Sequence, residues 1–390
     1  MRTRRNRSHN AVLARVILSA SISLFLFLCL IVLVQEPRRR IAHPEYPFVH
    51  RYNPNAKWNR LTYGDLAGMT GKPEHKILRT VRQETDNYGF MNSGESSSTP
   101  QTFDFIALGD SFTAASPIDQ ELLWPNQLSK ITGCKSYNLG HPAEGPWHSL
   151  MNFQIEIDRL HLSPEARVIW ALFSGNDLDG EYGQDVVLPP PQELTFPGKL
   201  GRFFRLRWEH NPAIQLLELH KKRKQSINRV IERHLPDGRF VLFLKAYAMR
   251  AKRDEAELLQ HPNYPLFVAT IEEMKQQCDR RNLILNIVCF PSKEEVYSWL
   301  CDGDTPWSQP VQSSAFSGIL KRICERLQIE FLDLTEILIK ESGDLYLNQG
   351  ELFYWQDDTH FNKIGHQRTA EYMAEKFYGK EEGLRQNKNG

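Results

Sequence analysis

Residues 103–112 read FDFIALGDSF, a short apolar run that leads directly into Gly109, Asp110 and Ser111. An apolar run of this length, ended by turn residues, is typical of a strand buried on both faces of a parallel sheet. The serine would lie at the carboxyl end of that strand, the edge at which open α/β sheets place their ligand sites. The stretch therefore predicts an α/β fold that presents the hydroxyl of Ser111 at one edge of the sheet.

The chain beyond this stretch alternates between strand-like and helix-like patterns. Further strands are predicted at residues 136–139, 168–173, 283–290 and 330–334. Helices are predicted at residues 122–131, 149–160, 267–280 and 316–327, and an amphipathic helix begins at Gly365 and His366. Strands that alternate with helices indicate a parallel sheet covered by helices on both faces.

Three further polar motifs accompany the Gly-Asp-Ser turn. They are Asn138-Leu139-Gly140 and Ser174-Gly175-Asn176-Asp177, each after a predicted strand, and Asp357-Asp358-Thr359-His360 near the C-terminus. Taken alone, each of the four is explained by an ordinary helix cap or turn. Because the carboxyl ends of parallel strands meet at one edge of a sheet, their joint occurrence predicts a single site there.

Together the four motifs, spread over about 250 residues, resemble those of the SGNH hydrolase superfamily, also called GDSL-like lipases and esterases. The resemblance implies a three-layer, flavodoxin-like fold and a serine mechanism without a cofactor. Ser111 is then the nucleophile, and His360 is the base that takes its proton. The family's D-x-x-H pattern makes Asp357 the residue that orients the imidazole, with the adjacent Asp358 as the alternative.

The same resemblance implies an oxyanion hole. Its donors would be the N–H groups of Ser111 and Gly140 and the side-chain amide of Asn176. The chain departs from the family at one position, since the usual G-x-N-D has glycine where this chain has Ser174.

A fifth motif is shorter and less specific. Residues 291–297 read PSKEEVY. This P-x-K-x-x-V-Y arrangement resembles the branch of SGNH proteins associated with acetylation of alginate and related polysaccharides. A plain helix start after a strand is the alternative interpretation.

Residues 16–34 form an uncharged apolar run of 19 residues, long enough to span a bilayer as a helix. Five arginines precede the run and three follow it closely, which predicts a cytoplasmic N-terminus and an extracytoplasmic remainder. A cleavable signal peptide is the competing interpretation. The run is long for that, and Gln35, Glu36 and Pro37 follow it in place of a small-residue cleavage site.

The predicted organisation has five parts: a basic cytoplasmic N-terminus (1–15), a transmembrane anchor (16–34), a stem with a possible hairpin (35–100), the α/β domain (101–380) and a polar tail (381–390). Within the α/β domain, residues 179–262 are predicted to be a basic helical insertion. Residues 199–253 hold fifteen Lys and Arg against four Asp and Glu, a balance of +11. Such a run is either a solvated face or a surface that attracts an anionic glycan or lipid head groups.

Composition and residue spacing give no support for a nucleic-acid partner or for a metal site. Lys and Arg (48) nearly balance Asp and Glu (47), so charge gives no argument for nucleic acid as a partner. The six cysteines form no C-x-x-C pair, and His360 and His366 lack an H-E-x-x-H motif, so no metal site is predicted. The sequence does not decide whether one or two disulfides form in an oxidising compartment.

The leading hypothesis is a membrane-anchored, extracytoplasmic esterase or O-acyltransferase that acts on acyl esters, with acetyl the favoured acyl group, of a carbohydrate. One alternative is a lipase or thioesterase that acts on long acyl chains. Another is a non-catalytic binding or assembly protein of an envelope glycan complex.

Overall fold

A parallel sheet forms the centre of the structure, a computed structural model that describes residues 18–23, 26, 40–93, 101–114, 116–191, 229–302 and 314–379. Its strands are β5 (Thr102–Leu108), β6 (Ser136–Asn138), β7 (His161–Phe173), β10 (Ile284–Phe290) and β11 (Glu330–Asp333). They lie in the order β11-β10-β7-β5-β6, and every neighbouring pair is parallel. In chain order this is the flavodoxin-like arrangement 2-1-3-4-5, so the predicted α/β sheet is confirmed.

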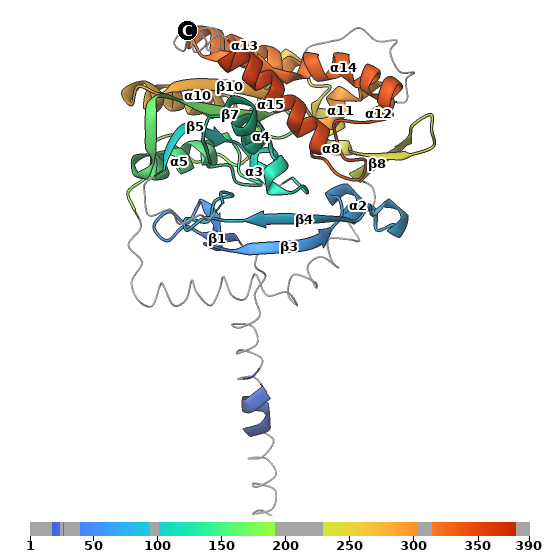
Figure 1. The fold of residues 1–390 in the computed structure, drawn as a ribbon, viewed down its shortest axis with the longest axis horizontal. Coiled ribbons are helices and arrows are strands. Elements are labelled where there is room, and N and C mark those ends of the chain that lie inside the picture. Colours follow the sequence, from blue (N-terminus) through green and yellow to red (C-terminus); the bar gives the residue numbers. More distant parts are fainter. Residues whose placement is uncertain are drawn as a thin grey trace, which may run out of the picture.

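The strands bury side chains on both faces, which explains their continuous apolar sequences. In β5, Ile106 and Leu108 belong to one hydrophobic core, whereas Phe105 and Ala107 belong to the other. The first face is covered by α5 (Pro146–Glu156), α10 (Tyr264–Arg280) and α13 (Ala315–Arg326). The second is covered by α4 (Trp124–Thr132), α14 (Leu334–Gln349) and α15 (Lys363–Tyr378) (Figure 1). The predicted helices are therefore present, and the domain has three layers.

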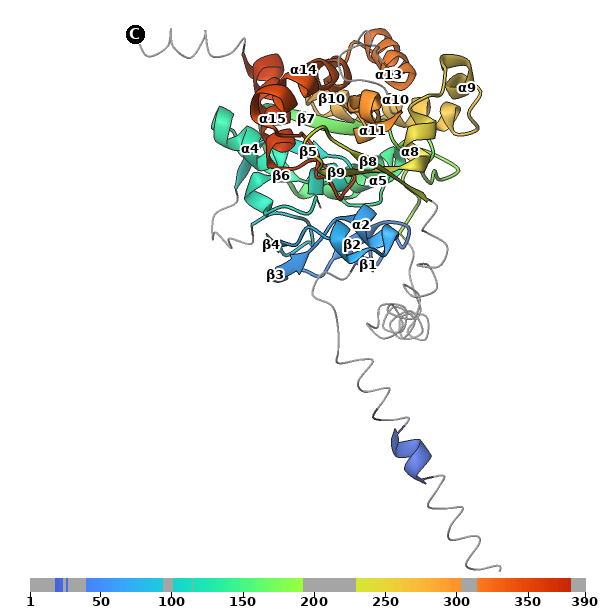
Figure 2. The ribbon, with the colours of Figure 1, turned by 90° about the vertical axis from the view of Figure 1, so that its right-hand side faces the viewer.

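Two antiparallel pairs precede the parallel sheet in the chain. They are β1 (Arg40–Ala42) with β2 (His50–Tyr52), and β3 (Lys57–Thr62) with β4 (Arg79–Glu84). Figures 1 and 2 both show them, in blue, beneath the α/β domain. Both pairs lie within residues 35–100, for which the sequence predicts a stem with a possible hairpin, and α2 (Asp65–Thr70) lies in the connection between β3 and β4. The segment packs onto the domain, because the guanidinium of Arg51 donates to Asn152 Oδ1 at 2.5 Å and to Glu156 Oε1 at 3.0 Å.

The predicted helical insertion is only partly helical within the described residues. Residues 230–244 form a hairpin of β8 (Val230–His234) and β9 (Phe240–Leu244), which precedes the short helices α8 (Lys245–Arg250) and α9 (Glu255–Leu259). Pro236, Asp237 and Gly238 favour the turn, and Gly238 has a positive φ of 86°. The turn residues, rather than the basic composition, therefore decide the local structure, and the chain forms a hairpin here. Residues 192–228 of the insertion lie outside the described part of the chain.

Several predictions concern segments that lie wholly or mainly outside the described residues. Most of the apolar run 16–34 is among them, as are residues 1–15, 94–100 and 381–390. In the described ranges, no helix combines the length and apolar character needed to cross a bilayer. Five cysteines are described, and all are buried and free: Cys134, Cys278, Cys289, Cys301 and Cys324.

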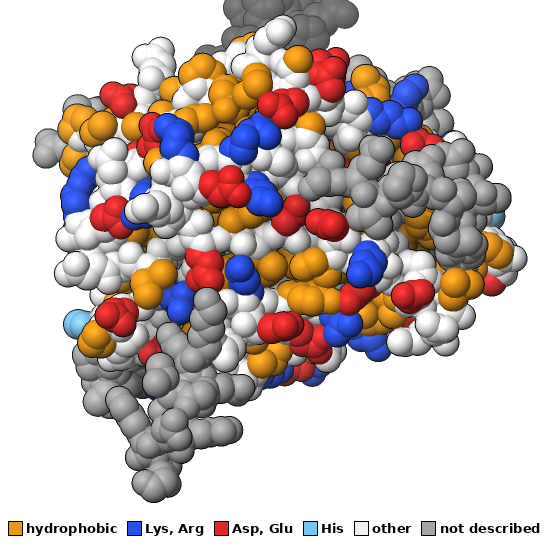
Figure 3. All heavy atoms as spheres, turned by 90° about the horizontal axis from the view of Figure 1, so that it is seen from above, with side chains coloured by type: hydrophobic (Ala, Val, Ile, Leu, Met, Phe, Trp, Pro, Cys, Tyr) orange, Lys and Arg blue, Asp and Glu red, His pale blue; other side chains and the backbone are white. Residues whose placement is uncertain are grey.

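Charged side chains of both signs are interspersed on the face shown in Figure 3. Hydrophobic side chains lie between them, and neither sign forms a large patch among the described atoms of that view. This mixture agrees with the near balance of the whole sequence.

Candidate active site

The turn after β5 presents Ser111. Gly109 has φ of +144°, and a Cβ on this residue would lie 2.4 Å from Thr113 Oγ1 and 2.9 Å from the carbonyl oxygen of Ala171. Only glycine combines that backbone conformation with so close an approach. The carboxylate of Asp110 accepts the N–H of Phe112 at 2.9 Å and fixes the turn. The short helix α3 (Ser111–Ala114) then begins at the serine itself.

The loop between α14 and α15 carries His360 to the serine. Its Nε2 atom lies 2.7 Å from Ser111 Oγ. The loop is folded back on itself, since the N–H of Trp355 donates to the carbonyl oxygen of His360 at 3.1 Å. Asn362 ends the loop by capping α15, and its side chain accepts the N–H of Ile364 at 2.8 Å. The predicted meeting of Ser111 and His360 is therefore present in the structure.

The acid that contacts His360 is Asp358 and not Asp357. Asp358 Oδ1 lies 2.6 Å from His360 Nδ1 and also accepts the N–H of His360 at 2.9 Å. Asp357 points elsewhere: its Oδ1 accepts from Arg79 at 2.6 Å and its Oδ2 from the N–H of Gly64 at 2.8 Å. The first choice from the D-x-x-H pattern is therefore corrected to Asp358, because Asp357 is committed to β4 and the residues before α2 (Asp65–Thr70).

Asp65 is a further acidic residue at the site, and no motif predicted it. Its carboxylate accepts from Thr359 twice, from the N–H at 2.9 Å and from the hydroxyl at 2.7 Å. Its own N–H donates to Asp358 Oδ2 at 2.9 Å. The N-terminal segment thus contacts the two residues that precede His360. The stretch around Gly64 has no motif signal that could have revealed this contact across 293 residues of sequence.

The predicted oxyanion-hole residues differ in the hydrogen bonds that they already make within the protein. The N–H of Gly140 donates to Asn138 Oδ1 at 2.8 Å, so it is engaged within its own turn. A Cβ on Gly140 would lie 2.6 Å from Thr113 Cγ2, which gives the glycine a packing reason. Asn176 follows β7, the strand that pairs with β5, and its Oδ1 is buried without a hydrogen-bond partner in the structure. Ser174, the departure from the family pattern, donates to Glu295.

Comparisons with known proteins find similarity only at a low level. No family model matches the chain, and no curated protein matches it. Among solved structures it is similar to a lipolytic protein of the G-D-S-L family from Desulfitobacterium hafniense, at 15% identity with a TM-score of 0.33. That match covers 69% of this chain and 97% of the other.

Two further matches are of the same kind. The esterase EstA from Pseudoalteromonas sp. is 11% identical with a TM-score of 0.34, over 70% of this chain and 96% of that one. An acetyl xylan esterase is 11% identical with a TM-score of 0.33, over 69% and 97%.

Electrostatics at the site favour a charged pair between His360 and Asp358. Burial opposes the imidazolium of His360, but the charge of Asp358 and their hydrogen bond outweigh it and raise the pKa of His360 to about 9. Burial likewise opposes the carboxylate of Asp358, but the charge of His360 and their hydrogen bond lower the pKa of Asp358. Burial raises the pKa of Asp110, which lies next to the nucleophile.

Asp65 has an exposed surface, but its carboxylate is engaged within the site. Desolvation and the neighbouring charge of Asp358 raise the pKa of Asp65 to about 6. The charge of Asp65 in turn raises the pKa of His360. Asp65 is therefore ionised in the range in which His360 titrates.

One group of described side chains has the geometry to hold a metal ion: Asp65, Asp358 and His360, whose nearest ligand atoms lie within 4.8 Å of one another. A cation there would take the imidazole from its 2.6 Å bond with Asp358, so the arrangement fits proton transfer better. His366 takes no part in the group. It is fully buried on α15 and accepts the N–H of Trp124 at 3.3 Å, and burial lowers the pKa of His366 to about 3.

Proposed function

We propose that this chain is a serine esterase or O-acyltransferase that acts on acyl esters of a carbohydrate. The observation that carries the proposal is the unbroken line of hydrogen bonds from Asp358 through His360 to Ser111, at 2.6 and 2.7 Å. A carboxylate, an imidazole and a hydroxyl in this order form a nucleophilic triad. A protein that used the fold only for binding would not need these three groups aligned.

The chemistry follows from this alignment. Ser111 Oγ attacks the ester carbonyl while His360 Nε2 takes its proton, and Asp358 stabilises the imidazolium that forms. The tetrahedral intermediate collapses to an acyl-serine, and His360 gives the proton to the departing alcohol. Water or a sugar hydroxyl then attacks the acyl-serine, His360 takes the proton of that attacking group, and Ser111 is regenerated.

The developing oxyanion needs donors at the carboxyl edge of β5 and β7. We assign this role to the N–H of Ser111 and to the side-chain N–H groups of Asn176, which follows β7, the strand that pairs with β5. The N–H of Gly140 is bonded to Asn138, so Gly140 can contribute only if that 2.8 Å bond opens.

Three features of the sequence support the finer parts of the proposal. The PSKEEVY motif favours a polysaccharide ester with a short acyl group, and the basic residues of 199–253 favour an anionic glycan. The apolar run 16–34 favours a membrane anchor with the site on the extracytoplasmic side. Partners would then be the membrane, the glycan and proteins that assemble it.

Hydrolysis of p-nitrophenyl acetate by the purified full chain tests the esterase activity. We expect turnover that disappears in Ser111→Ala and persists in the matched control Ser129→Ala, whose hydroxyl donates to Ser136 on a different part of the domain. Equal activity in wild type and Ser111→Ala would rule the proposal out. A series of p-nitrophenyl esters then separates a preference for acetyl from a preference for long acyl chains.

A sugar acceptor separates hydrolysis from transfer. With an acetyl donor and an added oligosaccharide, a transferase gives acetylated oligosaccharide, and a hydrolase gives acetate alone. Retention of the full chain, but not of a chain beginning at Ile41, in the membrane fraction after alkaline extraction tests the anchor. Release of both would contradict it.

A further inference from the structure

The PSKEEVY motif takes no part in the chemical steps, yet its side chains contact the loop between α14 and α15 that carries His360, here called the catalytic loop. Its residues follow β10, and α11 (Lys293–Val296) begins with Ser292 as cap. The side chain of Ser292 accepts the N–H of Glu295, and the side chain of Glu295 accepts the N–H of Ser292. This reciprocal capping fixes the start of the helix.

Lys293 is the first residue of that helix, and only 1% of its surface is exposed. Its ammonium donates to the carbonyl oxygen of Asp358 at 2.7 Å and to that of Trp355 at 3.1 Å. Burial lowers the pKa of Lys293. A buried ammonium is unfavourable unless its protons are hydrogen-bonded, and these acceptors belong to the loop that carries His360.

The first and last residues of the motif, Pro291 and Tyr297, also make hydrogen bonds with the catalytic loop. The N–H of Phe353 donates to the hydroxyl oxygen of Tyr297 at 2.8 Å. The hydroxyl of Tyr354 donates to the carbonyl oxygen of Pro291 at 2.6 Å. Residues 353–358 are therefore attached to the motif at both ends.

We propose that Lys293 and Tyr297 are positioning residues that hold this loop so that His360 meets Asp358 and Ser111 together. The inference rests on the proposed function, because positioning matters only if the three groups react. The ammonium of Lys293 donates to the backbone carbonyl oxygen of Asp358, two residues before His360. Loss of the ammonium therefore removes a hydrogen bond that holds in place the residue that orients the imidazole. A displacement of about 1 Å in such a group lowers turnover roughly 100-fold.

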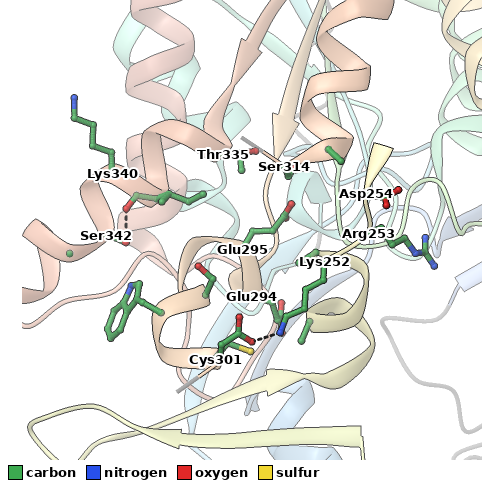
Figure 4. A pocket seen from close by; sticks show the side chains of 18 of the residues that line it. Lys252, Arg253, Asp254, Glu294, Glu295, Cys301, Ser314, Thr335, Lys340 and Ser342 are labelled. Atoms are coloured by element: carbon green, nitrogen blue, oxygen red, sulfur yellow. Dashed lines mark hydrogen bonds and ion pairs between the residues drawn. The ribbon is translucent and has the colours of Figure 1, made fainter. Parts of the chain in front are cut away.

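The neighbouring Glu294 gives a matched control. It is 2% exposed, and its Oε1 accepts the N–H of Leu244 in β9 at 2.6 Å, so its hydrogen bond is not to the catalytic loop, although its charge favours the ammonium of Lys293. It lines a cavity of about 790 Å³ together with Lys252 and Cys301 (Figure 4). Burial raises the pKa of Glu294 to about 7, so glutamine is close to its protonated form.

The test compares Lys293→Met, Tyr297→Phe and Glu294→Gln in the full chain. We measure kcat and KM with p-nitrophenyl acetate and the rate at which a fluorophosphonate labels Ser111, and circular dichroism checks folding. Lys293→Met should lower kcat and the labelling rate roughly 10- to 100-fold with KM nearly unchanged, and Tyr297→Phe should lower them several-fold. Glu294→Gln should lower kcat and the labelling rate less than Lys293→Met does, because it leaves the hydrogen bonds of Lys293 to the loop in place. Added propylammonium should partly restore kcat in Lys293→Ala, which a purely structural loss would not allow.

A folded Lys293→Met chain that is labelled at the wild-type rate overturns the inference and leaves the proposed function intact. If Lys293→Met does not fold, Tyr297→Phe decides, and an unchanged kcat in that variant overturns the inference. A wild-type chain that is never labelled overturns the proposed function and the inference with it.

Discussion

His360 Nε2 lies 2.7 Å from Ser111 Oγ, although 249 residues of sequence separate the two. The contact exists because β5 lies inside the parallel sheet and ends where the α14–α15 loop crosses its carboxyl edge. In the order 2-1-3-4-5, β5 is the strand beside which the connections change direction, and open α/β sheets bind ligands at such a point.

Asp358 and Asp357 should differ sharply when each is changed to asparagine. Asp358→Asn should lower kcat by up to roughly 10,000-fold, because the amide cannot support the imidazolium. Asp357→Asn should retain most of kcat, but it should lower the free energy of unfolding by up to about 3–5 kcal/mol, since it weakens the buried pair with Arg79. Steady-state kinetics and urea unfolding measure the two effects. The reverse pattern would restore Asp357 as the orienting acid.

Activity should rise with pH as His360 loses its proton. The base must be neutral, and the pKa of His360 is raised to about 9, so at pH 7 only about 1% of the free enzyme is active. The profile of kcat/KM between pH 6 and 10 should therefore climb tenfold per unit and level off above pH 9. The same shift stabilises the fold below about pH 6.5, and this contribution is lost as pH rises through 9. A midpoint near 6.5 would show that Asp358 does not support the imidazolium.

Asp65→Asn should move the same profile to lower pH. The charge of Asp65 raises the pKa of His360, so its removal should lower the midpoint, while the asparagine oxygen can still accept from Thr359. Asp158→Asn is the control, because that side chain is 79% exposed and pairs with Arg281 on the far side of the sheet. A profile that coincides with that of the control would exclude an electrostatic role for Asp65.

Gly64→Ala should displace the catalytic loop by a steric clash. A Cβ at Gly64 would lie 1.9 Å from the carbonyl oxygen of Asp357, a backbone atom that cannot move independently of the loop. We expect kcat to fall roughly 100-fold, in line with a displacement of about 1 Å. Gly318→Ala is the matched control, since its added Cβ meets no heavy atom within 4 Å on helix α13. It should keep kcat and gain up to about 1 kcal/mol of stability. Similar kcat values in both variants would contradict this reason for glycine at residue 64.

The sequence predicts the sheet well because its strands are buried on both faces. An apolar run such as residues 284–290 has one explanation at that length, and turn residues mark its end. Ser111 and His360 could be placed for the same reason, since each lies in a motif next to a recognisable element. The hairpin of β8 and β9 was missed because the basic composition around it outweighed the turn signal at Gly238.

The contacts around His360 were beyond sequence reasoning. The choice between Asp357 and Asp358 depends on which side of the loop faces Arg79, a partner 278 residues away. Asp65 lies in a stretch without a motif, so only the packing of the N-terminal segment reveals its bonds to Thr359. Local patterns fix elements, whereas the orientation of a loop follows from long-range hydrogen bonds.

Covalent labelling of Ser111 tests the central claim most directly. The full chain is incubated with a fluorophosphonate, and intact mass and peptide mapping locate the adduct. We predict one adduct, on Ser111, that is absent in Ser111→Ala and forms far more slowly in Asp358→Asn. A wild-type chain that gains no adduct, or gains one at another residue while Ser111→Ala still hydrolyses the ester, would contradict the triad.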